Sequence, residues 1–363
     1  MSVGFALDSP RGLYRLGGAV SMKRLLWNAT LCFTVSFVVS MISSVARADT
    51  ILLVSSDRSS SVLSFDPTTG AFLGPFVSAG SGGLTRPGGE AAGPDGNLYV
   101  ASNSTNQILR YSGSGEFLGV FASGGGLDKP SGITFGPDGN LYVNNHGTQG
   151  PNPVSSVLRY NGKTGAFMGA FVQPGAGGLS GASVGIDFGP DGNLYVESNS
   201  TNSILRFSGR TGQFMDAFVP AGSGGLSQPS GFVFGPDGNL YVASHGSQPV
   251  LRYNGTTGEF IDIFVSAGSG SIRNPTDLIF GPDGNLYVAS RGNSRILTFD
   301  GVTGEFRSTF IPQGTGGLSG PNELLFFTPA PEPGTLSLFG VGMVIAGCRL
   351  WIAKRPRLRW NAK

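Results

Sequence analysis

One eight-residue string, Gly-Pro-Asp-Gly-Asn-Leu-Tyr-Val, recurs five times in this chain of 363 residues. Successive copies lie 43, 53, 46 and 46 residues apart, and their aspartates are Asp95, Asp138, Asp191, Asp237 and Asp283. A period in the forties is typical of propellers and solenoids, in which each repeat is one supersecondary unit that packs against its neighbours. The sequence therefore predicts an array of similar units.

Each repeat can be divided into four short strands. The first is an apolar run such as residues 132–135, and a Pro-Asp-Gly-Asn turn joins it to the second, Asn-Leu-Tyr-Val. Proline presets φ in such a turn, and glycine accepts a positive φ. The third strand is like residues 108–111, and the fourth carries Phe at i and i+4, as in Phe117 and Phe121. Two positions with that separation share one face of a regular strand.

The two ends of the array carry incomplete units that complement each other. Residues 51–77 match strands two, three and four, whereas residues 322–327 match a first strand alone. Paired together, they complete a sixth unit and close a ring, which protects the edges that an open array would expose. We therefore predict an all-β fold, a six-bladed β-propeller over about residues 49–328. The alternative is an open solenoid, against which the split unit argues.

Composition supports many short strands joined by tight turns. Glycine contributes 60 residues, only 13% of residues are charged, and 26 are Phe. Glycine at this density would break a long helical bundle, and disordered chains lack so many aromatic residues. The formal net charge of +2 comes from the tails, because residues 49–330 contain 13 Lys and Arg against 20 Asp and Glu. Such a body would repel phosphate backbones, so we expect no nucleic-acid partner.

The first 48 residues have the features of an export signal. Lys23 and Arg24 precede an apolar run over 25–45, and Ala46-Arg47-Ala48 follows as a small-x-small site. This order predicts a secretory signal peptide over 22–48 that is cleaved after Ala48; a permanent membrane anchor is the alternative. We interpret residues 1–21 as lying upstream of the true start, because Met22 directly precedes the basic pair. Cys32 and Cys348 both lie in the tails, so the body contains no disulfide.

The C-terminal segment, 329–363, combines a Pro-Glu-Pro motif, an apolar run and a basic tail. The motif is Pro331, Glu332 and Pro333, the predicted apolar helix spans 335–353, and several arginines follow. The segment resembles the PEP-CTERM sorting signal. The resemblance implies a Gram-negative bacterium, an exosortase-type enzyme that processes the tail, and delivery to the periplasm, outer surface or extracellular matrix. It also implies membrane contact through the helix, transient or permanent; an ordinary single-pass anchor is the alternative.

The repeats resemble the NHL repeat and the related streptogramin-lyase and gluconolactonase-type propellers. The resemblance is clearest over residues 281–296 and covers nearly the whole body. The NHL pattern usually has Asp two places after the Val of the second strand. This chain instead has Ser102, Asn145, Ser198, Ser244 and Ser290. The resemblance implies fold only, because these propellers serve as enzymes, receptors and scaffolds alike.

The repeated Asp of each turn has two interpretations. It could bind calcium, but a calcium site needs several converging oxygens and each turn has one carboxylate. We therefore expect these aspartates to cap their own turns.

The opposite face of the ring carries the residues that differ between units. Three places after each Val the residues are Asp57, Asn103, His146, Asn199, His245 and Arg291. We interpret them as a polar ligand-binding rim; simple solvation of a variable surface is the alternative.

Acidic residues interrupt the first strands of three consecutive units. Asp277 and Glu323 stand where other units have Gly, and Glu90 stands one place later; Glu197 directly follows its Val. Gluconolactonase-like propellers, which the repeats resemble, hold a divalent metal near this place, and carboxylate oxygens suit calcium or magnesium. The metal hypothesis therefore assigns Glu90, Asp277 and Glu323 as ligands. The alternative is that they accept hydrogen bonds from backbone amides at the ring seam or face solvent.

These observations lead to two hypotheses on function. The first is a non-catalytic binding or scaffold module that requires no cofactor and binds a glycan, such as an exopolysaccharide, or a surface protein. The uniformity of the units favours it. The second is a calcium- or magnesium-dependent lactonase- or lyase-like enzyme, with Glu90, Asp277 and Glu323 around the cation and His245 as the catalytic acid or base.

Overall fold

The computed structural model describes residues 49–147 and 155–329. The predicted upstream extension, signal peptide, apolar helix and Pro331-Glu332-Pro333 motif lie outside these ranges. Within them, no helix has the length and apolar character needed to cross a membrane.

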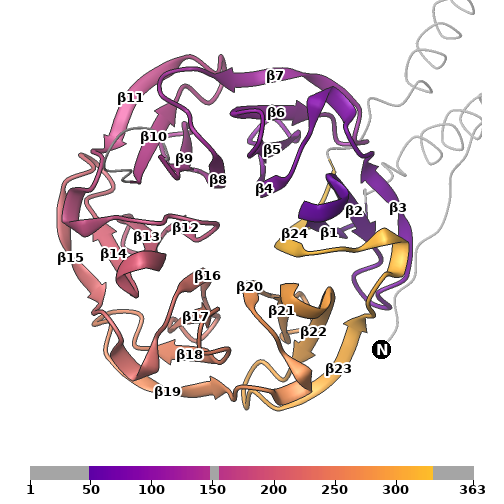
Figure 1. Cartoon of the computed structure of the whole chain (residues 1–363), viewed down its shortest axis with the longest axis vertical. Helices are drawn as coiled ribbons and strands as arrows, with labels where there is room; N and C mark the ends of the chain where they lie inside the picture. Colours follow the sequence, from indigo (N-terminus) through magenta and orange to yellow (C-terminus); the bar gives the residue numbers. More distant parts are fainter. Residues whose placement is uncertain (1–48, 148–154, 330–363) are drawn as a thin grey trace, which may run out of the picture. The chain divides into compact units, whose positions relative to one another are not determined.

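The described residues form six four-stranded antiparallel sheets arranged as a ring (Figure 1). Blade 1 contains β24 (Pro321–Phe327), β1 (Ile51–Ser56), β2 (Ser61–Phe65) and β3 (Phe72–Val77). Blade 2 contains β4 (Pro87–Ala92), β5 (Leu98–Ser102), β6 (Gln107–Tyr111) and β7 (Phe117–Ser123). Blade 3 contains β8 (Pro130–Phe135), β9 (Leu141–Asn145), β10 (Ser156–Tyr160) and β11 (Phe167–Val172).

The other three blades repeat this order. Blade 4 contains β12 (Ile186–Phe188), β13 (Leu194–Ser198), β14 (Ser203–Phe207) and β15 (Phe214–Val219). Blade 5 contains β16 (Pro229–Phe234), β17 (Leu240–Ser244), β18 (Val250–Tyr253) and β19 (Phe260–Val265). Blade 6 contains β20 (Pro275–Phe280), β21 (Leu286–Ser290), β22 (Arg295–Phe299) and β23 (Phe306–Ile311).

Short 3₁₀ turns lie in the connecting loops. They are η1 (Asp57–Ser59), η2 (Ser81–Gly83), η3 (Ala176–Gly178), η4 (Asn199–Thr201), η5 (Ser223–Gly225), η6 (Ser269–Ser271), η7 (Arg291–Asn293) and η8 (Thr315–Gly317).

Blade 1 is assembled from both ends of the body, as the split unit predicts. β24 pairs antiparallel with β1, with Ile51 opposite Phe327 and Val54 opposite Leu324. The first strand of every blade lies nearest the centre of the ring in Figure 1, and the fourth lies at the periphery. The six-bladed propeller is therefore confirmed, and the open solenoid is excluded.

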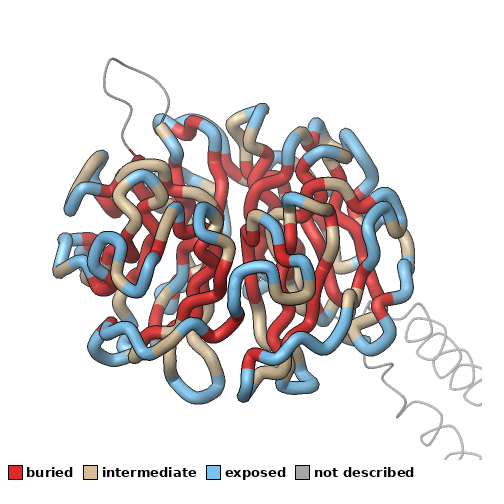
Figure 2. The backbone as a smooth tube through the Cα atoms, turned by 60° about the horizontal axis from the view of Figure 1, so that its bottom comes forward, coloured by how far each residue is buried: buried red, intermediate tan, exposed pale blue. Residues whose placement is uncertain are grey.

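The hydrophobic core lies between neighbouring blades. Leu141 and Val143 belong to the cluster shared with blade 2, whereas Tyr142, between them in β9, belongs to the cluster shared with blade 4. This alternation follows from the two-residue period of a strand, which directs successive side chains to opposite faces. Both faces of the second strands are thus buried, and the exposed residues concentrate in the loops and outer strands (Figure 2).

The fourth strands correct one sequence prediction. Phe117 packs on Tyr111 beside the loop of blade 1, whereas Phe121 packs on Tyr99 toward blade 3. The two Phe side chains therefore do not share a face. The register between β6 and β7 shifts between Arg110 and Tyr111, and a β-bulge of this kind inserts a residue and reverses the in-out alternation.

Candidate functional site

The Pro-Asp-Gly-Asn turns are closed by their own aspartates. In blade 3, Asp138 accepts hydrogen bonds from the backbone N–H of Asn140 (3.0 Å), the side-chain amide of Asn140 (2.8 Å) and the hydroxyl of Tyr142 (3.0 Å). Burial acts to raise the pKa of Asp138, but these hydrogen bonds outweigh it and the pKa lies below its usual value. The same contacts recur at Asp95, Asp191, Asp237 and Asp283. The predicted role as turn formers is confirmed.

The position where the NHL pattern has Asp also has a structural role here. The hydroxyl of Ser102 accepts a hydrogen bond from the backbone N–H of Thr85 at 3.1 Å, and Ser290 accepts one from Arg273 at 2.9 Å. Both serines are fully buried. A serine at this position therefore ties the end of the second strand to the loop that enters the blade.

The opposite face carries a polar pocket of about 260 Å³. We call it the rim pocket, and its polar lining is Asp57, Arg86, Asn103, Ser131, His146, Ser183, Asn199, Arg291 and Asn322. Five of the six residues of the predicted rim are among these, and His245 is not. The lining residues of the pocket come from two places. Some lie in loops that follow second strands, and others lie at the start of the central strands Pro87–Ala92, Pro130–Phe135 and Pro321–Phe327.

Amide and imidazole side chains of the rim pocket bridge neighbouring blades. Asn103 donates its amide N–H to the carbonyl of Pro130 at 3.2 Å, and Asn199 donates to Pro229 at 3.0 Å. His146 places Nδ1 3.1 Å from the carbonyl of Ala182. Among the described residues, the Oδ1 atoms of Asn103 and Asn199 accept no hydrogen bond and are not buried. The inter-blade contacts thus orient each amide and leave its oxygen available as an acceptor.

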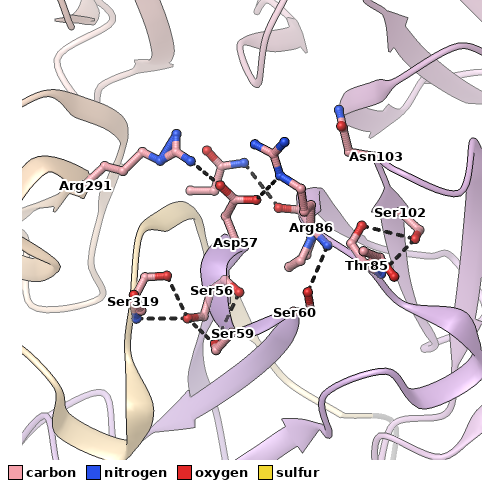
Figure 3. A network of polar contacts seen from close by, with 12 residues as sticks. Ser56, Asp57, Ser59, Ser60, Thr85, Arg86, Ser102, Asn103, Arg291 and Ser319 are labelled. Atoms are coloured by element: carbon pink, nitrogen blue, oxygen red, sulfur yellow. Dashed lines mark hydrogen bonds and ion pairs between the residues drawn. The ribbon is translucent and has the colours of Figure 1, made fainter.

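Asp57 organises the positively charged wall of the rim pocket (Figure 3). Asp57 is 4% exposed, and its carboxylate accepts hydrogen bonds from Arg86 Nε at 3.1 Å and from Arg291 Nη2. Arg86 leaves 60% of its side chain exposed, and the buried Arg291 Nε has no partner in the described residues. Two guanidinium groups thus face one carboxylate, which leaves the wall with one excess positive charge and with free donors.

His245 is placed differently from the other rim residues. It is half-buried beside Arg291, outside the lining of the rim pocket. Burial and the neighbouring Arg291 charge lower the pKa of His245 below its usual value. A neutral imidazole is therefore favoured at pH 7.

The acidic residues assigned to a metal lie at the seams between first strands. Glu90 is 2% exposed; its Oε2 accepts from the hydroxyl of Ser55 at 3.1 Å, and its buried Oε1 has no partner in the described residues. Asp277 Oδ2 accepts the backbone N–H of Leu324 in the next blade at 2.9 Å. Glu323 Oε2 is buried without a partner in the described residues.

Burial controls the ionisation of these carboxyl groups. It raises the pKa of Glu90 to about 8 and that of Asp277 to about 7. Burial and the neighbouring Asp277 and Glu90 also raise the pKa of Glu323. Since desolvation disfavours the charged form, Glu90 and Glu323 hold protons at neutral pH that the unfolded chain would release, whereas Asp277 is partly ionised there.

In the described ranges, no group of three or more His, Cys, Asp and Glu side chains is placed to hold a metal ion. The geometry therefore lends the assignment of Glu90, Asp277 and Glu323 no support. Asp277 instead follows the alternative raised from the sequence, in which a carboxylate accepts a backbone amide at the ring seam, whereas Glu90 accepts a side-chain hydroxyl there. Glu197 accepts backbone N–H groups from Ser183 and from Gly185, the latter at 2.7 Å, and both donors lie just before the first strand of its own blade.

Sequence analysis missed four polar residues of the rim pocket, which are Arg86, Ser131, Ser183 and Asn322. Arg86 lies in the loop before β4, and Asn322 in β24 donates to the carbonyl of Pro87 at 3.3 Å. Neither belongs to the repeated string or to the aligned rim position.

Comparisons with known proteins show the fold. No family model matches the chain, and no curated protein matches its sequence. A solved nidogen/laminin complex matches with TM-score 0.60 and 16% identity, covering 76% of this chain and 97% of that chain. A Bacteroides caccae protein of unknown function matches with TM-score 0.57, 16% identity and the same coverage. A streptogramin B lyase matches with TM-score 0.52 and 18% identity, covering 71% of this chain and 82% of that one.

Proposed function

We propose that this protein is an exported β-propeller that acts as a binding module and holds a glycan in the rim pocket. The observation that carries the proposal is the pocket itself, in which residues contributed by several blades converge at one end of the ring. Delivery to the envelope or extracellular matrix, with processing by an exosortase-type enzyme, is part of the proposal and is supported by the motif at Pro331, Glu332 and Pro333.

The chemistry of the rim pocket suits sugar hydroxyl groups. Asn103 and Asn199 offer outward amide oxygens as acceptors, and Arg86 offers exposed guanidinium donors. A hydroxyl can donate to the first kind of group and accept from the second. The volume of about 260 Å³ is below the usual range for drug-sized ligands, so it suits one sugar unit of a longer chain.

The architecture also supports recognition by a preformed surface. The side chain of Asp57 is held by two arginines, and the amides are held by the next blade. Groups fixed before binding lose little conformational entropy when the ligand arrives. A surface protein that inserts one polar side chain is the other partner class to test, and the nidogen/laminin complex has a related fold.

The metal-dependent enzyme hypothesis gains no specific observation in its favour. The acidic side chains form no metal-holding group within the described residues, and His245 lies outside the rim pocket. Measurement of bound calcium and magnesium in the purified protein tests this hypothesis directly.

Glycan binding is tested with the purified full-length protein on an array of bacterial oligosaccharides, followed by calorimetric titration of the best ligand. Asn103→Ala and Arg86→Ala each remove one group that would contact the sugar, so we expect each to weaken binding about tenfold, or ~1.4 kcal/mol. Lys163→Ala, an exposed cation in a turn of blade 3, is the matched control and should bind normally. Equal affinity in all four proteins, or the absence of any saturable glycan, would reject the proposal.

A further inference from the structure

Blades 4 and 5 each contain an arginine–aspartate ion pair that joins their third and fourth strands. In blade 4, Arg206 of β14 donates Nε to Asp216 Oδ1 at 3.1 Å and Nη2 to Oδ2 at 2.5 Å. In blade 5, Arg252 and Asp262 repeat both contacts, at 3.1 and 2.5 Å. Each pair has the two-point geometry in which a planar guanidinium binds a planar carboxylate most strongly.

Blade 3 retains the arginine and lacks the carboxylate. Arg159 occupies the place of Arg206 in its strand, but its partner across the sheet is Gly169 rather than an aspartate. Arg159 forms no ion pair with any described residue, and its buried Nε has no hydrogen-bond partner among them. The Nε–H that blades 4 and 5 satisfy internally is therefore unsatisfied here, which is costly for a buried polar group.

A cavity of about 130 Å³ lies beside this arginine. Its lining also includes Gly169 and Phe171 of blade 3 and Arg210 and Thr211 of blade 4. The Arg159 guanidinium lies 5.4 Å from the centre of the Phe171 ring, which fixes its plane. Arg210 is exposed and adds a second positive charge. The cavity is thus bordered by one guanidinium that packs on an aromatic ring and by a second that is exposed to solvent.

We propose that this cavity binds a carboxylate group from outside the chain, in the position that Asp216 and Asp262 occupy in blades 4 and 5. The ligand class is a sugar acid, a free uronate or a uronate unit of a polysaccharide. The carboxylate accepts two hydrogen bonds from Arg159, while Arg210 and the hydroxyl of Thr211 face the adjacent sugar hydroxyls. No step of this proposal depends on the rim pocket, which is built from other residues.

Blade 2 provides an internal comparison. Arg110 also faces a glycine, Gly119, but its guanidinium lies 3.9 Å from Asp95. In blade 3, Asp138 is near enough to Arg159 for the positive charge to lower its pKa, yet no ion pair forms. Among the third-strand arginines of blades 2 to 5, Arg159 is thus the one without an ion pair to a described residue, and blade 3 is the preferred site.

The test titrates the full-length protein with sodium glucuronate, glucose and inorganic phosphate in a calorimeter. We expect saturable binding of glucuronate, at least tenfold weaker binding of glucose, and weaker binding of phosphate, whose oxygens are not coplanar. A uronate oligosaccharide in a parallel titration distinguishes a polymer unit from a free sugar acid as the source. Equal affinity for glucose and glucuronate would overturn the proposal.

Variants then locate the site. Arg159→Lys keeps the charge but loses the planar fork, so glucuronate should bind about tenfold more weakly; Arg159→Leu should abolish binding, provided that its melting temperature shows a folded protein. Asp216→Ala frees Arg206 and should create an additional, weaker site. Arg307→Ala, at an exposed arginine of blade 6 that lines neither pocket, is the matched control and should leave glucuronate binding unchanged. Unchanged affinity in Arg159→Lys, together with no added site in Asp216→Ala, would place the carboxylate elsewhere and reject the proposal.

Discussion

At the scale of single residues, the number of hydrogen-bond donors around a carboxyl group and its burial decide whether the group is ionised. Asp138 receives three donors in an exposed turn, and its pKa falls. Glu90 receives one hydroxyl in a buried seam, and burial raises its pKa to about 8. Residues of the same chemical class therefore serve as an ionised turn cap in one place and as a neutral seam residue in the other.

The raised pKa of Glu90 predicts a specific pH dependence of stability. The unfolded chain releases this proton near its ordinary pKa of 4.5, whereas the folded protein keeps it until about pH 8. The folded state therefore binds more protons between these values, so this group's contribution to stability is complete below about pH 4.5 and declines as pH rises through about 8. Glu90→Gln mimics the neutral form and should lose less melting temperature than wild type between pH 5 and 9.

Thermal unfolding followed by circular dichroism across that pH range measures the effect. Glu116→Gln, at an exposed turn before β7, is the control and should follow wild type. If the plots of melting temperature against pH were parallel for Glu90→Gln and wild type, Glu90 would already be ionised in the folded protein.

At the scale of the repeat, the turn and the following strand form one hydrogen-bonded unit. The carboxylate of Asp138 joins the turn at Asn140 to the hydroxyl of Tyr142, and the Tyr142 ring packs against Phe171 and Phe188. The string that recurs in the sequence is thus one in which turn geometry and core packing depend on the same side chain.

Asp138→Ala should lower the free energy of unfolding by about 1–2 kcal/mol, because three donors lose their acceptor in a partly solvated turn. Asp138→Asn retains one acceptor oxygen, so its free energy of unfolding should lie between those of wild type and Asp138→Ala. Chemical denaturation with urea measures all three proteins. Equal midpoints for wild type and Asp138→Ala would mean that water replaces the carboxylate without loss.

At the scale of the whole molecule, ring closure depends on a strand supplied from the far end of the chain. β24 places Leu324 (3% exposed) and Phe327 (1% exposed) in the cores of blade 1. Its Leu324 N–H also donates to Asp277 of blade 6. Loss of this strand removes core side chains and leaves the inner edge of β1 unpaired.

A chain that ends at Gly320 should therefore lose its cooperative unfolding transition, since burial of each large apolar side chain contributes about 1.5–3 kcal/mol. A chain that ends at Pro329 retains the whole of β24 and is the control. Size-exclusion chromatography and calorimetry compare the two. A sharp, unshifted transition in the shorter chain would show that five blades and an incomplete sixth are sufficient.

The sequence predicted much of the fold because its signals are local and repeated. The turn around Asp138, the number of units and the pairing of residues 51–77 with residues 322–327 are all visible as a linear pattern. The shared face of Phe117 and Phe121 was predicted wrongly, because a bulge adds one residue between them and nothing in their spacing signals it. Alignment of the repeats also identified positions such as Asn103 and Asn199, which line a common pocket.

Properties that depend on distances through space and on exposure to water required the folded chain. Repetition places residues at equivalent positions, which is why the blades, their order and their closure follow from the sequence. It does not specify that Arg86 and Arg291 share Asp57, that Glu90 lies where water cannot solvate its charge, or that Arg159 faces an unfilled cavity. Hydrogen bonding and desolvation act over a few ångströms in three dimensions, and residues as distant in sequence as Asp57 and Arg291 meet only when the ring closes.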